Sequence, residues 1–458
     1  NWGPGSMSSF ALHKYQKTAV DRLLNDGQLG LLWDMGVGKT LTSLSAVDNW
    51  PIPLRTLIIA PKRCCTRVWP TEIEKFGFDL DVSLLLGTPK QRLKALDKPA
   101  DVKVINPEGI NWLYETCKKA KDVPFDALLV DESTEFKNAT GIRFKALKQL
   151  IPHIPVRMIL TGTPIPQSYA DLWAQIFILD QGKRLGKNIT EFRRRYCYRD
   201  YWKKWHVNEF ACPEIDELIS DIVSRIDAAD HLDMPDLRFN RVVIELPKKV
   251  KEAYDQGLWE LQNEDPEIGF DSTGASFTRV RTLCSGFAYV ADEINPDAPQ
   301  ETKWLHKEKV DAIGEIHAGI GHKPLLVAFN FRAEREALVE KYKCDFIDGT
   351  TSSRQGDNLV DKWCRGELSM LAIHPGAVKY GLNMQSGGNH LAWISLPTSL
   401  ADWQQTNARL YRQGQKDSVT IHSVIAHDTV DARLINLMES KETTQDAFLR
   451  AMKDAVNA

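Results

Sequence analysis

Short apolar runs that alternate with helical stretches are the feature that most limits how this chain can fold. Many of them lack the polar alternation of a half-exposed strand, which is typical of strands buried on both faces. A β-α-β-α order indicates parallel pairing. The sequence therefore predicts an α/β fold with two parallel-sheet lobes, whose strands lie in residues 29–33, 56–60, 102–106, 127–131, 157–161, 324–329, 370–374, 391–397 and 419–425.

The segments between these lobes have a different composition. Residues 181–240 and 250–290 are rich in charged and aromatic residues at helical spacing, apart from a strand pattern at 241–246. Residues 292–302 are polar and contain proline, as linkers do. We expect an expression scar at 1–6, an N-terminal ATP-binding lobe at 7–180, a helical insertion at 181–240, a strand, helical segment and interlobe linker at 241–303, and a C-terminal lobe at 304–458.

The bulk composition excludes few functions. A length of 458 residues suits two or three domains, and a net charge of −3 gives no global field, although a local basic groove is enough to bind nucleic acid. Eight cysteines without a CxxC pair indicate reduced thiols and no disulfide-linked partner. Cys197, His206 and Cys212 are better interpreted as scattered side chains than as a zinc site. No apolar run reaches the roughly 20 residues of a membrane span. We expect a cytoplasmic protein, nucleoid-associated if bacterial or phage-encoded.

A glycine-rich loop, WDMGVGKTLTSL (33–44), follows one apolar strand and opens a helix. Gly36, Val37 and Gly38 would turn backbone N–H groups around an anion, Lys39 would reach the β- and γ-phosphates, and the Thr40 hydroxyl would bind Mg²⁺. The full phosphate-loop pattern requires glycine where Trp33 stands, so an ordinary glycine-rich turn is the alternative. The loop predicts ATP and Mg²⁺ as ligands.

A second strand, in FDALLVDES (125–133), ends in two carboxylates. Asp131 would bind Mg²⁺, and Glu132 would polarise the attacking water. A solvated acidic turn is the alternative, but it becomes less plausible beside the glycine-rich loop, because ligands gather at the carboxyl ends of parallel strands. Asp131, Glu135 and Lys137 also weakly imitate the metal site of a nuclease.

The segment ARLYRQGQ (408–415) carries two arginines three residues apart. We expect it to be helical, so that Arg409 and Arg412 share one face, with Gln405 supporting that face. Such a guanidinium pair is suited to an anion, which we interpret as the γ-phosphate of ATP bound at Lys39. Surface pairing with carboxylates is the alternative.

Several further motifs occur in a fixed order beside these: HKYQ (13–16), TGTP (161–164), GLN (381–383) and QQTNARLYRQGQ (404–415). Together the set resembles the superfamily-two helicase motifs of the Swi/Snf-type DNA translocases, and it covers residues 10 to 440. The similarity is strongest to the annealing-helicase branch and to compact phage or prophage members. The resemblance implies two RecA-like lobes, ATP hydrolysis with Mg²⁺, and DNA, particularly double-stranded DNA, as the partner.

The resemblance also implies roles for individual residues. Tyr15 and Gln16 would contact the adenine, Gly381 and Gln405 would support the nucleotide site, and Arg409 and Arg412 would act as arginine fingers. Thr161 and Thr163 would couple nucleotide to nucleic acid. Phosphate contacts to DNA would come from Lys62, Arg63, Asn106, Thr350, Thr351 and Ser352.

The chain also departs from the family pattern at several other positions. Ser133 and Thr134 follow the Asp-Glu pair where these motors usually have alanine or glycine and then histidine, which leaves the contact between this turn and TGTP open. The glutamine expected soon after TGTP is shifted to Gln167. Lys379 occupies a position where small residues are frequent.

The stretch EFRRRYCYRDYWKKWHV (191–207) interleaves basic and aromatic side chains. It is either a DNA-facing surface that includes Arg194 and Arg195, or a helix or hairpin whose aromatics fill the core while its basic groups are solvated.

The leading prediction is an ATP-driven translocase on double-stranded DNA that remodels branched DNA or protein–DNA complexes. The rivals are a strand-separating DNA or RNA helicase, the motor of a restriction-like nuclease system, and a nucleotide-gated binding module without turnover. The sequence leaves the protein partners unknown.

Overall fold

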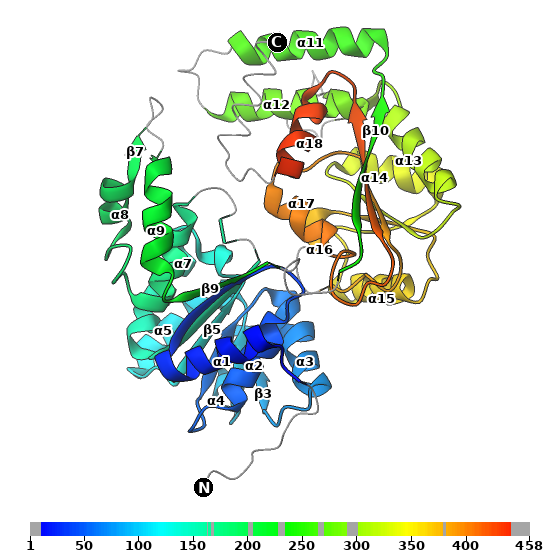
Figure 1. Cartoon of the computed structure of the whole chain (residues 1–458). Coiled ribbons are helices and arrows are strands. Elements are labelled where there is room, and N and C mark those ends of the chain that lie inside the picture. Colours follow the sequence, from blue (N-terminus) through cyan, green and yellow to red (C-terminus); the bar gives the residue numbers. More distant parts are fainter. Residues whose placement is uncertain are drawn as a thin grey trace. The chain divides into compact units, whose positions relative to one another are not determined.

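The structure is a computed structural model that describes residues 11–162, 164–165, 169–199, 205–227, 234–263, 270–290, 301–378 and 382–440, without the side chains of 258–263, 270–276 and 440. The chain forms two compact units, Asn1–Asp233 and Met234–Ala458, both drawn in Figure 1. The predicted scar at 1–6 and most of the predicted linker at 292–302 lie outside the described residues, as do Thr163, Gln167, Lys379 and Gly381.

The first unit is built on a seven-stranded sheet with the order β3-β4-β2-β5-β6-β1-β9, in which every pairing is parallel. Its strands are β1 (Gln28–Trp33), β2 (Thr56–Ile59), β3 (Val82–Leu84), β4 (Val102–Ile105), β5 (Ala127–Asp131), β6 (Val156–Thr161) and β9 (Val223–Ile226), beside a hairpin of β7 (Cys197–Arg199) and β8 (Trp205–Val207). Its α-helices are α1 (Lys14–Asp26), α2 (Lys39–Asp48), α3 (Trp69–Lys75), α4 (Pro89–Asp97), α5 (Ile110–Ala120), α6 (Ile142–Leu150), α7 (Asp171–Asp180), α8 (Ile189–Tyr196) and α9 (Cys212–Ile219). Short helical segments are η1 (Cys64–Val68), η2 (Pro107–Gly109), η3 (Ser133–Phe136), η4 (Ile151–His153) and η5 (Glu209–Ala211).

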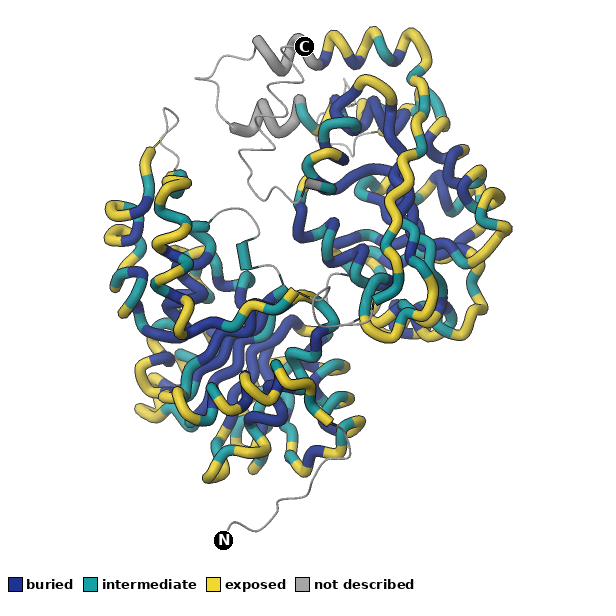
Figure 2. Tube along the Cα trace, in the orientation of Figure 1, coloured by how far each residue is buried: buried dark blue, intermediate teal, exposed yellow. Residues whose placement is uncertain are grey.

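The central strands of this sheet are buried almost throughout, which Figure 2 shows as dark blue segments. Their uninterrupted apolar runs therefore reflect burial of both faces of the sheet, as predicted. The register brings three strand ends together, because Leu32 of β1 lies opposite Thr161 of β6, and Asp131 of β5 lies opposite Leu160. The polar residues that follow β1, β5 and β6 consequently share one edge of the sheet.

The predicted helical insertion at 181–240 differs from the observed structure. β9 pairs in parallel with β1 and so extends the first sheet, whereas residues 237–240 belong to the second unit. Helix α8 packs Phe192 and Tyr196 into the core of the first unit. The sequence missed β9 because it is a short edge strand with one buried residue, Val223, and a half-exposed strand of four residues has almost no periodicity to detect.

The second unit has a six-stranded parallel sheet with the order β10-β17-β16-β13-β15-β14. Its strands are β10 (Leu237–Ile244), β13 (Leu325–Ala328), β14 (Asp345–Ile347), β15 (Met370–Ile373), β16 (His390–Trp393) and β17 (Val419–Ala426), beside an antiparallel pair of β11 (Phe287–Val290) and β12 (Glu301–Trp304). Its helices are α11 (Lys248–Asn263), α12 (Phe270–Ser285), α13 (Glu308–Gly319), α14 (Arg332–Tyr342), α15 (Ser353–Cys364), α16 (Pro375–Val378), α17 (Leu400–Asn407) and α18 (Val430–Ser440). The predicted α/β class with two parallel-sheet lobes is confirmed.

All eight cysteines are free, and five of them are buried. Among the described residues, no helix has both the length and the hydrophobicity that crossing a membrane requires.

A buried ion pair ties the second unit together and gives a first prediction. Lys309 of α13 donates to Asp431 of α18 at 2.5 Å, and the backbone N–H of Ala426 donates to the same carboxylate oxygen at 3.1 Å. Asp431→Asn leaves the buried ammonium without a counter-charge, so we expect a loss of about 3–5 kcal/mol of unfolding free energy. Urea denaturation measures this loss. Glu340→Gln, in the exposed pair with Lys307, is the control and should cost at most about 1 kcal/mol.

Candidate active site

The loop between β1 and α2 has the backbone geometry of a phosphate cradle. Gly36 and Gly38 adopt φ angles of 84° and 79°, a region that side chains disfavour, and Gly38 caps the N-terminus of α2. A Cβ on Gly38 would lie 2.3 Å from Nε2 of Gln16. Lys39 donates from Nζ to the carbonyl oxygens of Trp33 at 2.8 Å and Asp34 at 2.9 Å, so its ammonium lies inside the loop.

The carboxylates at the end of β5 lie at the same edge of the sheet. Asp131 accepts a hydrogen bond from Nε1 of Trp69 at 3.1 Å. Burial raises the pKa of Asp131, while the nearby ammonium of Lys39 and the Trp69 bond oppose this rise. Glu132 adopts a left-handed φ of 54°, which marks a tight turn out of the strand.

Gly162, the second residue of TGTP, also lies against the lysine. A Cβ at this position would be 3.6 Å from Nζ of Lys39 and 3.1 Å from Cγ of Met35. Thr161 before it is fully buried. The donor set at this edge comprises an ammonium, the oxygens of Asp131 and the hydroxyl of Thr40. It fits Mg²⁺, which prefers carboxylate and hydroxyl oxygens, together with the phosphates of a nucleotide.

Tyr15 and Gln16 of α1 both bind the backbone of the glycine-rich loop. The Tyr15 hydroxyl and the Gln16 Nε2 donate to the carbonyl of Val37 at 3.0 and 3.2 Å, and Gln16 Oε1 accepts from the backbone of His13 at 2.8 Å. Gln16 is only 3% exposed. Its contact with adenine stays a prediction, and in this structure both ends of its amide bind the chain itself.

The departure at Trp33 has a structural explanation. Its indole is buried, donates from Nε1 to Ser224 Oγ of β9 at 2.9 Å, and contacts Tyr15 edge-on with a 5.3 Å centroid separation. A glycine would lose these contacts between the glycine-rich loop, α1 and β9.

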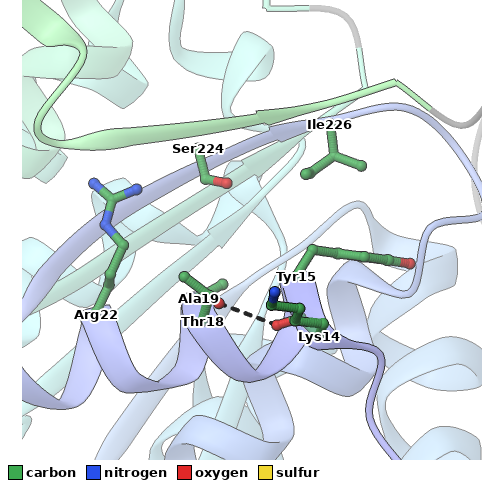
Figure 3. A pocket seen from close by; sticks show the side chains of 7 residues that line it. All are labelled: Lys14, Tyr15, Thr18, Ala19, Arg22, Ser224 and Ile226. Carbon is green, nitrogen blue, oxygen red and sulfur yellow. Dashed lines mark hydrogen bonds between the residues drawn. The ribbon is translucent and has the colours of Figure 1, made fainter. Parts of the chain in front are cut away.

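A cavity of about 350 Å³ opens beside this cluster, between α1 and β9. Figure 3 shows Tyr15 and Ile226 facing each other across it, with Ser224 on the same strand as Ile226. Its lining is Lys14, Tyr15, Thr18, Ala19, Arg22, Ser224 and Ile226.

The arginine pair of the second unit differs from the expected geometry. Helix α17 ends at Asn407, and residues 408–414 form turns, so the prediction that both arginines share a helical face is wrong. Arg409 is 7% exposed and donates to the carbonyl oxygens of Gln405 at 2.9 Å and Leu382 at 2.8 Å. Arg412 is half-exposed and donates to the side chain of Asn383 in the GLN motif. These tertiary bonds to residues 382–383 override the local helical pattern.

The predicted DNA contacts have different environments. Lys62 is exposed and Arg63 half-buried at the start of the helical stretch after β2. Asn106 is 6% exposed and donates to Glu108 at 2.5 Å, so the structure gives it no open surface for a phosphate. Thr350, Thr351 and Ser352 lie at or near the surface before α15. The hydroxyl of Thr350 donates to Asp348 at 2.6 Å, and Ser352 caps α15.

The basic and aromatic stretch at 191–207, of which residues 200–204 lie outside the described residues, has both buried and exposed side chains, and its contact with DNA stays a prediction. Tyr196 is buried, whereas Tyr198 and Trp205 are 50% and 37% exposed. The guanidinium groups of Arg193 and Arg199 lie over the Trp205 ring at 5.6 and 5.0 Å. Of the two arginines singled out from the sequence, Arg194 is exposed and Arg195 pairs with Glu214 at 2.7 Å.

The nuclease and zinc alternatives find no support in the part of the chain that is described. Glu135 accepts from Arg143 at 3.2 Å within the turn that follows Asp131. No group of three or more His, Cys, Asp or Glu side chains in this part is arranged to bind a metal ion.

Two parallel-sheet lobes, one with a phosphate loop and an Asp-Glu strand end and the other with an arginine pair, define a helicase-like ATPase. Residues 15–275 match the SNF2-related domain, which is over half of the chain. The chain therefore belongs to the SNF2-related family, as its motifs predicted, and it is an ATPase.

Relatives extend along nearly the whole chain. It is 30% identical to the putative protein p41 of Acyrthosiphon pisum secondary endosymbiont phage 1, over 98% of this chain and 100% of that protein. It is 25% identical to the putative ATP-dependent helicase/translocase YwqA of Bacillus subtilis, and 24% identical to the DNA annealing helicase and endonuclease ZRANB3 of Bos taurus. These matches cover 96% and 97% of this chain but only 49% and 41% of the relatives. A solved SWI2/SNF2 ATPase core of Sulfolobus solfataricus in complex with dsDNA aligns with a TM-score of 0.44 and 20% identity, over 96% of this chain and 94% of that chain.

Proposed function

We propose that the protein is a Mg²⁺- and ATP-dependent translocase on double-stranded DNA that remodels branched DNA or protein–DNA complexes. One observation carries the ATP part of this proposal: Lys39, Asp131 and Gly162 meet at the carboxyl edge of a single parallel sheet. The DNA part rests on the family and on relatives whose names include a translocase and a DNA annealing helicase.

The positions of the groups in the first unit support the following roles. The backbone N–H groups of Gly36 to Lys39 would surround the phosphates, and the Lys39 ammonium would exchange its two carbonyl partners for phosphate oxygens. Asp131 and Thr40 would bind Mg²⁺, which neutralises phosphate charge when bound. Glu132 would accept the proton of the attacking water.

The arginines of the second unit would supply the remaining positive charge. Arg412, being the more exposed of the two, is the candidate finger for the γ-phosphate. Arg409 is better suited to positioning, because its two bonds to backbone carbonyls join the GLN segment to the end of α17. Hydrolysis would then require the two lobes to close around one nucleotide, as a motor needs.

The cavity between α1 and β9 is the candidate site for the adenine ring. It lies next to the phosphate loop, since Tyr15 both lines the cavity and binds the carbonyl of Val37. A planar base would contact the Tyr15 ring on one side and Ile226 on the other.

DNA phosphates would bind groups that are already at the surface. We assign this role to Lys62, Thr350, Thr351, Ser352 and Arg194, and we omit Asn106 because of its burial. Such contacts ignore base sequence, which translocation requires.

Glu132→Gln tests the general base. The variant keeps the size of the side chain but loses its basicity, so ATP binding should persist while turnover falls by about 10²–10⁴-fold. Phosphate release and titration with a fluorescent ATP analogue separate the two effects. Glu135→Gln, three residues further along the chain, is the control, and equal losses in both variants would contradict the assignment.

The choice of polymer tests the motor. ATP turnover measured with no polymer, duplex DNA, single-stranded DNA and RNA should rise by about tenfold or more with duplex DNA alone, and this rise should weaken with salt because phosphate contacts release counterions. An equal or larger rise with single-stranded DNA or RNA would favour the rival helicase.

Translocation without strand separation is tested by displacement. The protein should displace the third strand of a DNA triplex in the presence of ATP and leave a plain duplex paired. Unwinding of the duplex would identify a strand-separating helicase, and nicking of a plasmid with Mg²⁺ alone would identify a nuclease.

A further inference from the structure

We propose that Gln175 is a positioning residue that couples the TGTP segment to the catalytic Asp131-Glu132 turn, and that it does so through Ser133. The inference rests on the proposed function, since the coupling it describes is the stimulation of ATP turnover by DNA. The relay would supply the contact between this turn and TGTP in a chain that has Ser133 where Swi/Snf-type motors usually have alanine or glycine.

A continuous chain of hydrogen bonds joins the two segments, and its bond between Ser133 and Gln175 is buried. Ser133, directly after Glu132, donates from its hydroxyl to Oε1 of Gln175 at 2.7 Å. Nε2 of Gln175 donates to the carbonyl oxygens of Pro164 and Asp171, both at 2.8 Å. Pro164 is the last residue of TGTP. Ser133 and Gln175 are both 0% exposed.

The amide of Gln175 has little freedom in this position. Its oxygen accepts one bond and its two N–H groups donate one bond each, so any rotation breaks at least one of them. A break inside the core leaves a polar group without water to replace its partner, which costs about 1–3 kcal/mol. A shift of Pro164 is therefore transmitted to Ser133 instead of being absorbed between them.

Packing by itself does not explain a glutamine here. The neighbours of Gln175 on α7 are buried apolar residues, including Trp173, Ala174, Ile176 and Phe177. An apolar side chain of the same size would fill this position without the cost of burying an amide. The glutamine is accounted for by the three bonds it makes.

The turn that Ser133 anchors controls a catalytic side chain. Glu132 has a left-handed φ of 54°, a conformation that costs a residue other than glycine about 1–3 kcal/mol unless its surroundings maintain it. Ser133 is bonded within the core on the carboxyl side of this residue. Movement of TGTP would reorient Glu132 relative to the attacking water, which makes hydrolysis sensitive to whatever moves TGTP.

Two single variants and their combination test the relay. Gln175→Met keeps the side-chain length and removes all three bonds, Ser133→Ala removes one oxygen, and the double variant replaces the pair with apolar groups. The turnover rate with and without saturating duplex DNA, the ATP affinity and the melting temperature are measured for each. Ser83→Ala is the matched control, because Ser83 is also buried but its hydroxyl donates to the carbonyl of Ala95 at the far edge of the sheet.

The expected result is uncoupling. DNA-stimulated turnover should fall by about tenfold in each single variant and in the double variant, while unstimulated turnover and ATP affinity change by less than about threefold. The double variant should regain melting temperature relative to the single variants, because it removes both ends of the buried Ser133–Gln175 bond together, yet it should stay uncoupled. If the pair has a purely structural role, the double variant should instead recover both the melting temperature and the DNA-stimulated turnover.

Three outcomes would overturn the relay. These are normal stimulation in Gln175→Met or in the double variant, parallel loss of stimulated and unstimulated turnover, and an effect of equal size in Ser83→Ala. If Gln175→Met does not fold, Ser133→Ala carries the same test. Absence of DNA stimulation in the unmodified protein would instead reject the proposed function and, with it, the relay.

Discussion

Arg412→Ala is expected to lower DNA-stimulated ATP turnover by about 10³–10⁵-fold, the range observed for arginine fingers in phosphoryl transfer. The guanidinium would stabilise charge on the γ-phosphate in the transition state, so its loss should reduce the maximal rate and leave ATP affinity nearly unchanged. Arg412 is half-exposed and its side chain is oriented by Asn383, which suits a group that must contact a ligand. Steady-state phosphate release gives the rate, and titration with a nucleotide analogue gives the affinity.

An exposed arginine of the same unit provides the control for this variant. Arg332 lies on α14 and pairs with Glu336 at 2.7 Å, one turn further along the same helix. Arg332→Ala should therefore leave the maximal rate within about twofold of the unmodified protein, as surface substitutions usually do. Normal turnover in Arg412→Ala would remove this residue from catalysis and leave it only the structural role of its bond to Asn383.

Lys39→Ala is expected to reduce ATP turnover by about 10³-fold, since removing one preorganised donor from a developing charge already costs 10²–10³-fold. Unlike Arg412→Ala, this variant should also weaken ATP binding, because the ammonium would contact the phosphates before and during reaction. Lys39 additionally bonds two loop carbonyls and opposes the rise in the pKa of Asp131. Its loss should therefore raise the pKa of Asp131 further and shift the acid limb of the pH–rate profile to higher pH.

Lys75→Ala is the control for Lys39. Lys75 is an exposed lysine on α3 that pairs weakly with Glu72 at 3.9 Å. Its replacement should affect neither affinity nor rate. An unchanged ATP affinity and rate in Lys39→Ala would contradict the phosphate-loop assignment, and a pH profile that does not shift would contradict the electrostatic link to Asp131.

Much of the site could be predicted because its groups follow directly from strand ends. β5 and β6 end at Asp131 and Thr161, and β1 lies just before the loop that holds Lys39. All three strands are nearly continuous apolar runs, and parallel pairing requires their carboxyl ends to share one edge of the sheet. The left-handed φ angles of Gly36 and Gly38 explain why glycine stands at both positions of the loop, and the contact of the loop with phosphate stays a prediction.

The errors have a common cause. Residues 408–414 have a helical pattern but form turns, because Arg409 bonds the carbonyl of Leu382, 27 residues earlier. Asn106 follows a strand as the motif order requires, yet it folds back onto Glu108 and is buried. β9 joins the first sheet although its own four residues give almost no strand signal. In each case a hydrogen bond or strand pairing formed in the folded chain outweighed the pattern of the local sequence.

The sequence by itself determined the α/β class, the two parallel sheets and the family, because apolar runs without polar alternation need cover on both faces and the ordered motifs mark the loops between them. Only the tertiary structure decided which side chains contact one another. Trp69 binds Asp131 across 62 residues, Trp33 binds Ser224 across 191, and Gln175 binds Ser133 across 42. Such partners are determined by how whole helices and strands pack against one another in three dimensions. The spacing of residues along the sequence does not reveal this packing.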